Sequence, residues 1–447
     1  MRILQSKKEI EKILNRWLTG PQCEQFLQML EHVQGRSSKI KDWSSIHSPD
    51  DLVDYNSLEE PSSDDSYSRL VIGKLNGGLG TSMGCAGPKS LIKVKGEKTF
   101  MDLIVEQVRQ LNAKWNKDIP LLLMNSFYTD KETAAFLDAC DVPVTSFKQN
   151  MFPRVDAKSF LPLSPDEYGW YPPGHGDFYN CMEQQGILRR LIEQGKDILF
   201  MSNADNLGAV ADSKILNYMI EKKVPFLIEV TPKTPADVKG GTLYKDEDRL
   251  KLLEIAQVPD EHVDEFCSQE KFSVFNTNNI WINLVSLEEK MQEGPLNLNV
   301  IVNRKTIQEK PVVQLETAIG SALDCFAGAV GLCVSRDRFM PVKKTEDLFL
   351  VQSNIFNLDE GRLVRNKERK ILSLPIISFG DTLQQVEAFQ KCFPRIPDLL
   401  ELEALDIFGQ VRFEGTASLK GQVGLNGKSQ SIIIESGREI ENESIEY

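Results

Sequence analysis

Residues Leu70–Ser90 read LVIGKLNGGLGTSMGCAGPKS, and this stretch passes from an apolar run of strand length into a glycine-rich loop. The loop contains five glycines, namely Gly77, Gly78, Gly80, Gly84 and Gly87. Glycine tolerates positive φ and lets the backbone approach a ligand closely. Lys89 and Ser90 close the stretch. A glycine-rich loop that follows a strand and ends on a lysine is typical of a phosphate-binding site.

Two familiar nucleotide-binding motifs do not fit this loop. The Walker A motif needs a Gly-Lys pair, but Pro88 separates Gly87 from Lys89 and has no N–H to donate. The dinucleotide motif GxGxxG is met by Gly78 and Gly80, but Met83 stands where its third glycine is required. The loop therefore disfavours both a P-loop ATPase and an NAD-binding enzyme.

The chain around the loop alternates short apolar runs with helical patterns. Strands are expected in four runs: 69–75, 120–126, 197–203 and 224–230. Helices are expected over 101–111, 178–194 and 214–223. Strands that alternate with helices favour an α/β fold with a βαβ-type parallel sheet, which binds ligands beyond the carboxyl ends of its strands.

The pattern of apolar and polar residues changes at both ends of this α/β region. Residues 1–60 mix charged and aliphatic residues and predict an N-terminal helical region, followed by the polar stretch NSLEEPSSDDSYS. Residues 61–375 form the α/β region. Residues 376–447 contain short apolar pieces separated by glycine and polar residues, which predicts a small β-solenoid with coils of irregular length.

Composition limits the partners and the location. The net charge of −13 argues against nucleic acid, because a phosphate backbone needs a basic face. No apolar run reaches the length of about 18 residues that a membrane span needs. The N-terminal residues lack the apolar core of a signal peptide. The eight cysteines are scattered without a CxxC pair, which favours reduced thiols and a cytoplasmic location.

Several segments together resemble the eukaryotic-type UTP–glucose-1-phosphate uridylyltransferases, the UDPGP family. Besides LNGGLGTSMGCAGPKS, the similar segments are NSFYTD, FKQNMFPR, YPPGHGDFY, MSNADNLGA, PKTPADVKGGTL, LLEIAQVP, FNTNNIW and SRDRFMPVKKTEDL. They follow the family order from about residue 70 to about residue 350. The UDP-N-acetylhexosamine pyrophosphorylases share a similar glycine loop but lack the GCAGPKS and FNTNN segments.

The resemblance implies a nucleotide-diphospho-sugar transferase fold of the GT-A, Rossmann-like type. Residues 61–375 would be the catalytic nucleotidyltransferase domain, a mixed sheet flanked by helices. Residues 376–447 would be a C-terminal domain that resembles a left-handed β-helix, and the expected contact of a homo-oligomer.

The implied reaction joins UTP and glucose 1-phosphate to give UDP-glucose and pyrophosphate. The sugar phosphate is already an oxyanion near neutral pH, because the second pKa of a phosphate monoester is about 6. The enzyme therefore needs no strong base; it must hold two polyanions in line and offset their charge. Lysines, backbone donors and a divalent cation, here expected to be Mg²⁺, meet that need.

The resemblance assigns the charged groups of the site. Lys89 would bind the UTP phosphates, and Lys343 would neutralise charge on the α-phosphoryl group. Asp205 follows the apolar run DILF and would hold Mg²⁺. Read from its position alone, Asp205 could instead cap a following helix.

The remaining assignments concern the base, the sugar and its phosphate. The resemblance implies nucleotide binding by Leu75, Asn76, Gly77, Gly78, Met124, Gln149 and Gly176. It implies sugar-phosphate binding by His175, Asn203, Gly241, Glu254, Asn276 and Asn278. Strand alternation would put Asn276 and Asn278 on one face, and either could be the one that contacts the sugar. His175 is expected to donate a hydrogen bond to the sugar or its phosphate.

Two alternatives remain open. A related UDP-sugar pyrophosphorylase could take galactose or N-acetylhexosamine phosphate on the same fold. A catalytically silent nucleotide-binding scaffold would have lost Lys89, Asp205 or Lys343, and the sequence retains all three.

Overall fold

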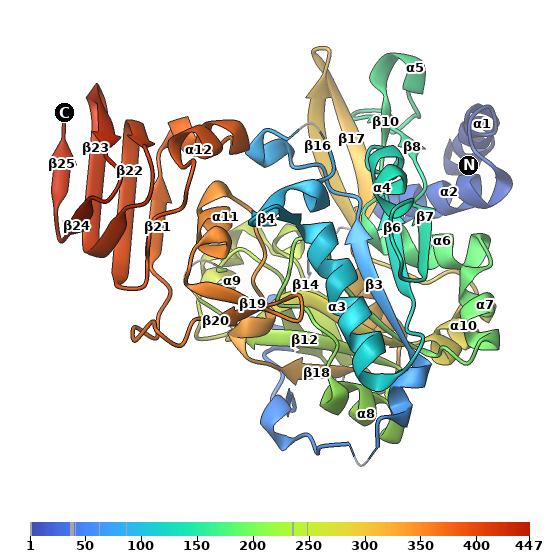
Figure 1. Ribbon diagram of the computed structural model, residues 1–447. Coiled ribbons are helices and arrows are strands. Elements are labelled where there is room, and N and C mark those ends of the chain that lie inside the picture. Colours follow the sequence, from blue (N-terminus) through green and yellow to red (C-terminus); the bar gives the residue numbers. More distant parts are fainter. Residues whose placement is uncertain are drawn as a thin grey trace.

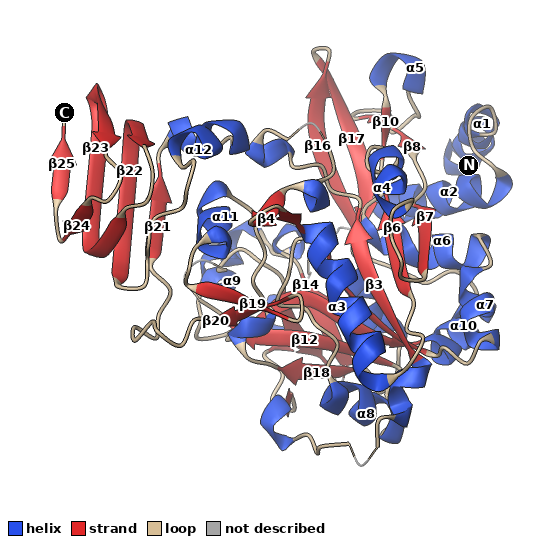
Figure 2. Ribbon diagram, viewed as in Figure 1, coloured by secondary structure: helices blue, strands red, loops and turns tan. Residues whose placement is uncertain are grey.

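A computed structural model describes residues 2–35, 40, 42–61, 63–85, 87–234, 237–247 and 249–447. Ala86 of the glycine loop and Pro235 and Ala236 of the PKTPADVKGGTL segment lie outside these described residues. Figures 1 and 2 show a central mixed α/β body, with the N-terminal helices at one end and a β-rich C-terminal part at the other. No helix within the described ranges is long and apolar enough to cross a bilayer.

The helices of the described chain are distributed over the N-terminal part, the central body and the C-terminal part. They are α1 (Arg2–Leu14), α2 (Gly20–Gly35), α3 (Phe100–Trp115), α4 (Asp130–Leu137), α5 (Pro165–Tyr168), α6 (Phe178–Gln184), α7 (Ile187–Glu193), α8 (Ser213–Glu221), α9 (Val263–Cys267), α10 (Leu284–Gln292), α11 (Thr345–Gln352) and α12 (Val386–Cys392). The single helix expected over 178–194 is divided into α6 and α7. Gly186 separates them because its φ of +67° is left-handed and ends a helix.

An eight-stranded sheet forms the centre in the order β2-β18-β12-β15-β11-β3-β6-β7. Its strands are β2 (Val53–Asp54), β18 (Val330–Cys333), β12 (Phe226–Pro232), β15 (Val274–Asn283), β11 (Ile198–Asn203), β3 (Leu70–Asn76), β6 (Leu121–Asn125) and β7 (Val144–Lys148). Strand β15 runs antiparallel to both neighbours, and every other pair is parallel. The four expected strands are confirmed. The expectation of a purely parallel sheet is wrong, because β15 is inserted antiparallel between β11 and β12, and the sheet is mixed as the resemblance implied.

Strand alternation explains why these strands read as continuous apolar runs. In β3, Leu70 and Ile72 pack with α3 and α8, whereas Val71 packs with α6, α7 and α10 on the opposite face. Strand β11 divides in the same way, with Phe200 on the first face and Met201 on the second. Both faces of the sheet are covered by helices, so both sets of side chains are buried.

The N-terminal part packs at one edge of the body and includes strands as well as helices. Helices α1 and α2 share an apolar cluster with the hairpin of β16 (Val300–Ile307) and β17 (Lys310–Thr317), to which β9 (Val155–Asp156) is added. The helical expectation for residues 1–60 is confirmed for α1 and α2 only. Strand β1 (Ile46–His47) pairs with β13 (Thr242–Asp246), which pairs with β14 (Arg249–Leu253), and β2 joins the central sheet. These strands form because partners far away in the chain offer them sheet edges.

The C-terminal part is a stack of parallel strands (Figure 1). They are β21 (Ile376–Phe379), β22 (Leu402–Phe413), β23 (Ser418–Ile434), β24 (Glu439–Glu441) and β25 (Ser444–Glu446). In the register Ala404 opposes Gln422, and Val411 opposes Ile432, so coil length is irregular as expected. The apolar core of this stack continues to Met83 in the glycine loop and Val342 beside Lys343.

Smaller two-stranded sheets complete the structure. They pair β8 (Phe152–Pro153) with β10 (Trp170–Tyr171), β4 (Lys93–Lys95) with β5 (Lys98–Thr99), and β19 (Phe356–Asp359) with β20 (Arg362–Arg365). The boundaries expected near residues 60 and 375 stay a prediction.

Candidate active site

The register of the sheet places several sequence-predicted residues in one row at the carboxyl ends of its parallel strands. Asn203 of β11 lies opposite Leu75 of β3, and Leu75 lies opposite Met124 of β6. Asn278 of β15 extends the row, because its Nδ2 donates to Asn203 Oδ1 at 2.9 Å. Parallel strands end at the same edge, so residues far apart in sequence meet there.

The glycine loop leaves β3 at this edge. Ser126 Oγ donates a hydrogen bond to the carbonyl oxygen of Gly77 at 2.8 Å. A Cβ atom at Gly77 would lie 2.6 Å from Gln149 Nε2, so glycine lets this amide lie against the loop. At Gly78 a Cβ atom would meet no described atom within 4 Å. Packing within the protein therefore does not account for glycine at Gly78, whereas close approach of a ligand would.

Lys89 and Asp205 meet although 116 residues separate them. Lys89 follows the glycine loop and Asp205 follows β11, and Nζ lies 2.6 Å from Oδ2. Both side chains are largely buried, at 16% and 18% exposed. The helix-cap alternative for Asp205 is wrong, because the next helix, α8, is capped by Asp212, which accepts hydrogen bonds from Lys214 N and Ile215 N.

Lys343 is held beside Asp205 through the backbone. The N–H of Val342 donates to the carbonyl oxygen of Asp205 at 3.2 Å. The Lys343 ammonium lies 5.7 Å from the Phe339 ring centroid and 5.9 Å from that of Phe275. Its side chain is exposed and makes no ion pair with a described carboxylate. The structure thus brings the Lys343 segment to the strand end that carries Asp205.

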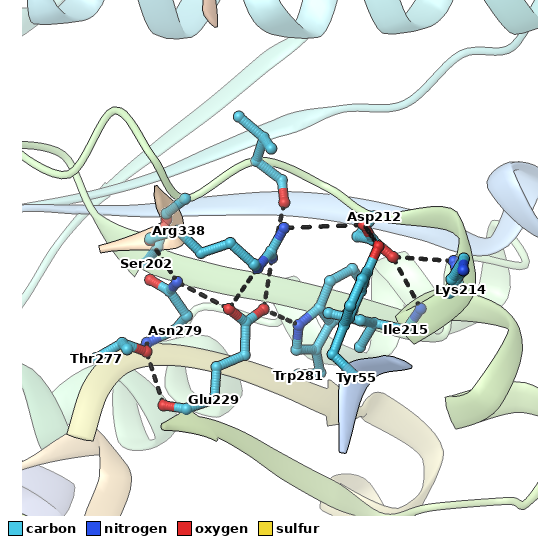
Figure 3. A network of polar contacts seen from close by, with 12 residues as sticks. Tyr55, Ser202, Asp212, Lys214, Ile215, Glu229, Thr277, Asn279, Trp281 and Arg338 are labelled. Atoms are coloured by element: carbon cyan, nitrogen blue, oxygen red, sulfur yellow. Dashed lines mark hydrogen bonds and ion pairs between the residues drawn. The ribbon is translucent and has the colours of Figure 1, made fainter. Parts of the chain in front are cut away.

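The group that anchors this segment was not predicted from the sequence. Arg338 donates from Nε and Nη2 to the two carboxylate oxygens of Glu229, at 2.7 and 2.6 Å (Figure 3). Glu229 is fully buried and also accepts hydrogen bonds from Trp281 Nε1 and Asn279 Nδ2. A single carboxylate inside the apolar strand VPFLIEV was the signal that could have identified it, since a buried charge needs a partner.

Asn206 joins the anchored segment to the Asp205 turn. Its Oδ1 accepts from the N–H of Met340 at 2.9 Å, and its Nδ2 donates to the carbonyl oxygen of Arg338 at 3.1 Å. Both ends of the amide are used within the protein. Asn206 is therefore a structural neighbour of Asp205.

Gln149 presents a buried oxygen without a partner. Its side chain is 9% exposed, and Oε1 accepts no hydrogen bond from any described residue. Its backbone N–H donates to the carbonyl oxygen of Asn125 at 2.9 Å. A buried carbonyl oxygen without a donor is costly, which makes Gln149 Oε1 a candidate acceptor for a donor on a ligand.

Asn76 lies behind the row. It is 3% exposed, and its Nδ2 donates to Asn125 Oδ1 at 2.8 Å and to Thr133 Oγ1 at 3.0 Å. The side-chain NH₂ of Asn76, one of the residues expected to bind the nucleotide, is therefore occupied within the protein. Its neighbours Leu75 and Gly77 lie at the open edge instead.

His175 and Gly176 lie against the end of β17. A Cβ atom at Gly176 would lie 2.5 Å from Thr317 Oγ1, which makes glycine necessary there. His175 Nδ1 accepts a hydrogen bond from the N–H of Ile319 at 2.9 Å. Burial lowers the pKa of His175 to about 4. The imidazole is neutral at physiological pH and carries its proton on Nε2, where it is a hydrogen-bond donor.

We expect His175 to contribute no ionisation to the pH–rate profile between about pH 5 and pH 8. The acid limb of kcat/KM for glucose 1-phosphate should fall near pH 6, the approximate second pKa of the phosphate itself, in both the parent and His175→Asn. An acid limb that moves in His175→Asn would contradict this.

The same burial of His175 should make the free energy of unfolding depend on pH. An unfolded histidine titrates near pH 6.5, whereas His175 in the folded protein titrates near pH 4, so the unfolded state binds this proton first as the pH falls. The free energy of unfolding should therefore decrease as the pH falls from about 6.5 to about 4.

The groups expected to bind the sugar gather near Lys343. A Cβ atom at Gly241 would lie 2.7 Å from Glu254 Oε1, and the N–H of Asn276 donates to the carbonyl oxygen of Gly241 at 2.8 Å. Burial raises the pKa of Glu254 to about 7, and the Lys343 charge opposes that rise. Glu254 is therefore a carboxyl group that changes charge near neutral pH.

A bulge corrects the strand alternation expected for Asn276 and Asn278. Along β12, Glu229 pairs with Asn279 and the next residue, Val230, pairs with Asn276, so two residues of β15 are left over. Asn278 takes a left-handed φ of +59°, and its N–H donates to Asn276 Oδ1 at 2.8 Å. The bulge turns Asn278 toward Asn203, which period-two alternation could not predict.

Comparisons with known proteins agree over nearly the whole chain. The family model described as UTP–glucose-1-phosphate uridylyltransferase matches residues 23–420. The chain is 44% identical over 421 residues to UTP–glucose-1-phosphate uridylyltransferase 2 of Dictyostelium discoideum, covering 91% of this chain and 84% of the relative. It is 44% identical over 429 residues to the Hordeum vulgare enzyme, covering 93% and 90%.

Solved structures agree with this result. A mutant UDP-glucose pyrophosphorylase of Leishmania major, in complex with UDP-glucose, is similar with a TM-score of 0.89 and 32% identity over 98% of both chains. A Trypanosoma brucei protein described as UDP-glucose phosphorylase is similar with a TM-score of 0.85 and 35% identity, again over 98% of both chains.

Proposed function

This chain belongs to the UTP–glucose-1-phosphate uridylyltransferase family, and from that premise we propose how it joins UTP and glucose 1-phosphate into UDP-glucose and pyrophosphate. The oxyanion of the sugar phosphate attacks the α-phosphorus of UTP in line with the leaving pyrophosphate. The observation that carries the proposal is the Lys89–Asp205 pair, a cation and a carboxylate at the carboxyl edge of the sheet. It lies where an α/β sheet binds its ligand.

The proposed catalysis depends on holding the two substrates in position and offsetting the charge of their phosphates. Lys89, at the end of the glycine loop, binds the phosphates of UTP, and Lys343 offsets charge on the α-phosphoryl group. Lys89 is 16% exposed, and a cation held in such a partly buried site acts strongly on charge that develops in the transition state. The neutral His175 fits a donor to the sugar phosphate, since its pKa of about 4 makes it a poor base for a nucleophile that is already ionised.

Asp205 is the proposed ligand of Mg²⁺. In the part of the chain that the structure describes, no three His, Cys, Asp or Glu side chains gather into a metal-binding cluster. Mg²⁺ fits a site of this kind, because it is commonly bound through one or two carboxylates and completed by water and substrate phosphates. When bound, Mg²⁺ would bridge phosphate oxygens and offset their charge. Asp205 Oδ2 is paired with Lys89, so Asp205 would hold the ion next to the lysine that binds the phosphates.

Gln149 and the neighbouring residues at the carboxyl ends of β3 and β6 are proposed to recognise uracil. Uracil offers an N3–H donor, and the unpartnered Gln149 Oε1 is a buried acceptor beside the glycine loop. Backbone groups of Leu75, Gly77 and Gly78 and the side of Met124 complete the base site, with Gly176 close to the nucleotide. A site built to accept a hydrogen bond rejects an analogue that lacks the donor.

The sugar side of the site is proposed to combine neutral amides with one carboxyl group. Asn203 would contact the phosphate, and Asn278, which is hydrogen-bonded to Asn203, would lie between the phosphate and the hexose. Gly241 lies against Glu254 and accepts a hydrogen bond from the N–H of Asn276, and these three residues would bind the hydroxyl groups.

A cytoplasmic location and self-association through residues 376–447 are also proposed. All eight cysteines are free thiols, as expected in a reducing compartment.

The proposed self-association is supported by exposed apolar side chains of the C-terminal part. These are Ile376, Ile433 and Tyr447, at 73%, 53% and 59% exposed. Light scattering that gives the mass of a single chain at micromolar concentration would contradict self-association.

We expect Asp205→Asn to abolish both the Mg²⁺ dependence and most of the turnover. The amide keeps the shape of the side chain but removes the negative charge that holds a hard cation. The measurement is the initial rate against Mg²⁺ concentration. A variant that keeps the parent's Mg²⁺ midpoint would remove Asp205 from the metal site. Asp337→Asn serves as a control, because that carboxylate is exposed and paired with Arg365.

The activity itself is tested by pyrophosphate release from UTP and Mg²⁺ with glucose 1-phosphate, galactose 1-phosphate and N-acetylglucosamine 1-phosphate in parallel. Rapid release with glucose 1-phosphate is expected. Release with another sugar phosphate alone would retain the mechanism and change the substrate. No release, from a protein that binds UTP, would identify a silent scaffold.

A further inference from the structure

We propose that Gln25 of the N-terminal helix α2 is a positioning residue for the active site, acting through the buried carboxylate of Asp177 on Gln149 and His175. This inference rests on the proposed function, because it takes Gln149 as the uracil contact and His175 as the sugar-phosphate contact. It gives the N-terminal region an indirect part in substrate recognition.

The Asp177 carboxylate is a junction of four hydrogen bonds. Asp177 is fully buried. Its Oδ1 accepts from Gln25 Nε2 at 2.7 Å and from Asn150 Nδ2 at 3.1 Å. Its Oδ2 accepts from the backbone N–H of Asn150 at 2.6 Å and from Cys181 Sγ at 3.1 Å. A buried carboxylate is tolerated only when such donors surround it, so each donor restrains where Asp177 lies.

The junction holds two substrate-binding segments at adjacent residues. Asn150 directly follows Gln149, and Asp177 directly follows Gly176 and lies two residues after His175. The peptide between Gln149 and Asn150 is therefore tied to the segment that carries His175. The N–H of Gln149 is tied in turn to β6 through Asn125. A shift of Asp177 would move the base contact and the sugar-phosphate contact together.

Helix α2 supplies the outer half of the junction. Gln22 Nε2 donates to Asn150 Oδ1 at 2.8 Å, and Gln25 Oε1 accepts from Asn150 Nδ2 at 3.2 Å. The two glutamines lie three residues apart and so share one face of the helix. The same helix buries Phe26 and Leu30 in the apolar cluster with β16 and β17. That packing fixes the helix against the body, which makes Gln25 a rigid support.

Helix α2 also provides a matched control. Gln28 is one turn further along, is exposed, and makes no side-chain hydrogen bond with a described residue. Gln25→Met removes the amide and keeps the volume of the side chain, and Gln28→Met makes the same change away from the junction. Gln25→Glu places a second carboxyl group against Asp177 and should have the larger effect.

The experiment measures kcat/KM for UTP and for CTP, and KM for glucose 1-phosphate, with the full chain and Mg²⁺. Cytosine lacks the N3–H that Gln149 Oε1 would accept, so the UTP-to-CTP ratio reports the position of Gln149. In Gln25→Met the ratio should fall about three- to tenfold, the range that corresponds to the net contribution of one hydrogen bond. The KM for glucose 1-phosphate should rise by a similar factor. Gln28→Met should match the parent.

The outcomes distinguish a failure of the proposed function from a failure of the positioning role of Gln25. A parent protein that does not turn over UTP and glucose 1-phosphate overturns the proposed function. An active parent whose Gln25→Met variant keeps the ratio and the KM, with or without a lower melting temperature, overturns the positioning role. If Gln25→Met does not fold, Gln25→Asn retains an amide that is too short to reach Asp177. An unchanged UTP-to-CTP ratio of kcat/KM in Gln25→Asn would also overturn the positioning role.

Discussion

Lys89→Ala should lower kcat by about two to three orders of magnitude, the loss typical when one preorganised charge-stabilising group is removed. The Lys89 ammonium lies at the end of the glycine loop and against Asp205, where it is largely buried and screened little by solvent. Removing it takes away a cation that offsets phosphate charge and leaves Asp205 without its partner. The measurement is the rate of pyrophosphate release at saturating substrates.

Lys93→Ala is the matched control for Lys89. Lys93 lies four residues further on, and its ammonium is paired with Glu97 in an exposed i, i+4 contact. Exposed pairs of this type contribute little, so the Lys93 variant should keep the parental rate. A folded Lys89→Ala variant with a near-parental rate would remove this lysine from the mechanism.

Arg338→Met should destabilise the protein by about 3–5 kcal/mol, because it leaves the Glu229 carboxylate buried without its cation. The Arg338 side chain is 11% exposed and Glu229 is fully buried, so solvent cannot replace the lost partner. Figure 3 shows the carboxylate between the guanidinium and the indole of Trp281. The loss is measured as the shift of the urea unfolding midpoint. The segment that carries Lys343 should also lose its anchor, so residual activity at low temperature should fall.

Arg109→Met is the matched control for Arg338. Arg109 also donates from Nε and Nη2 to one carboxylate, that of Asp141, but the two side chains are 41% and 67% exposed. Water can replace that partner, so the cost should stay near 0.5 kcal/mol or below. An equal decrease in the free energy of unfolding in the two variants would show that burial does not determine how much the Arg338–Glu229 pair contributes to stability.

Several parts of the site could be predicted because their signals are local. The apolar run before Gly77 and the run before Asp205 each form a strand, and both strands end at the same edge. The loop glycines and Lys89 then fall where a parallel sheet binds ligands. The resemblance of the NADN and FNTNN segments to a known family extended this to Asn203 and Asn278, which are hydrogen-bonded in the structure.

Other parts depend on partners that no local pattern indicates. Glu229 is visible as a charge within an apolar strand, but Arg338, its partner, is 109 residues away. The bulge at Asn278 depends on the register of β12 against β15. The occupied amide of Asn76 depends on α4, which supplies Thr133. The Gln25–Asp177 contact spans 152 residues and joins a region that the sequence presented only as charged helices.

The sequence by itself determined four strands of the central sheet, the helical segments beside them, the glycine loop and the chemical types at the strand ends. Periodicity and turn residues act over a few neighbouring residues, and burial on both faces selects apolar runs. Only the tertiary structure decided which of these residues meet. Strand order, the antiparallel insertion of β15 and the docking of α2 are set by the packing of surfaces from distant parts of the chain. A buried charge or amide acquires its partner, and with it its role, only when those surfaces close.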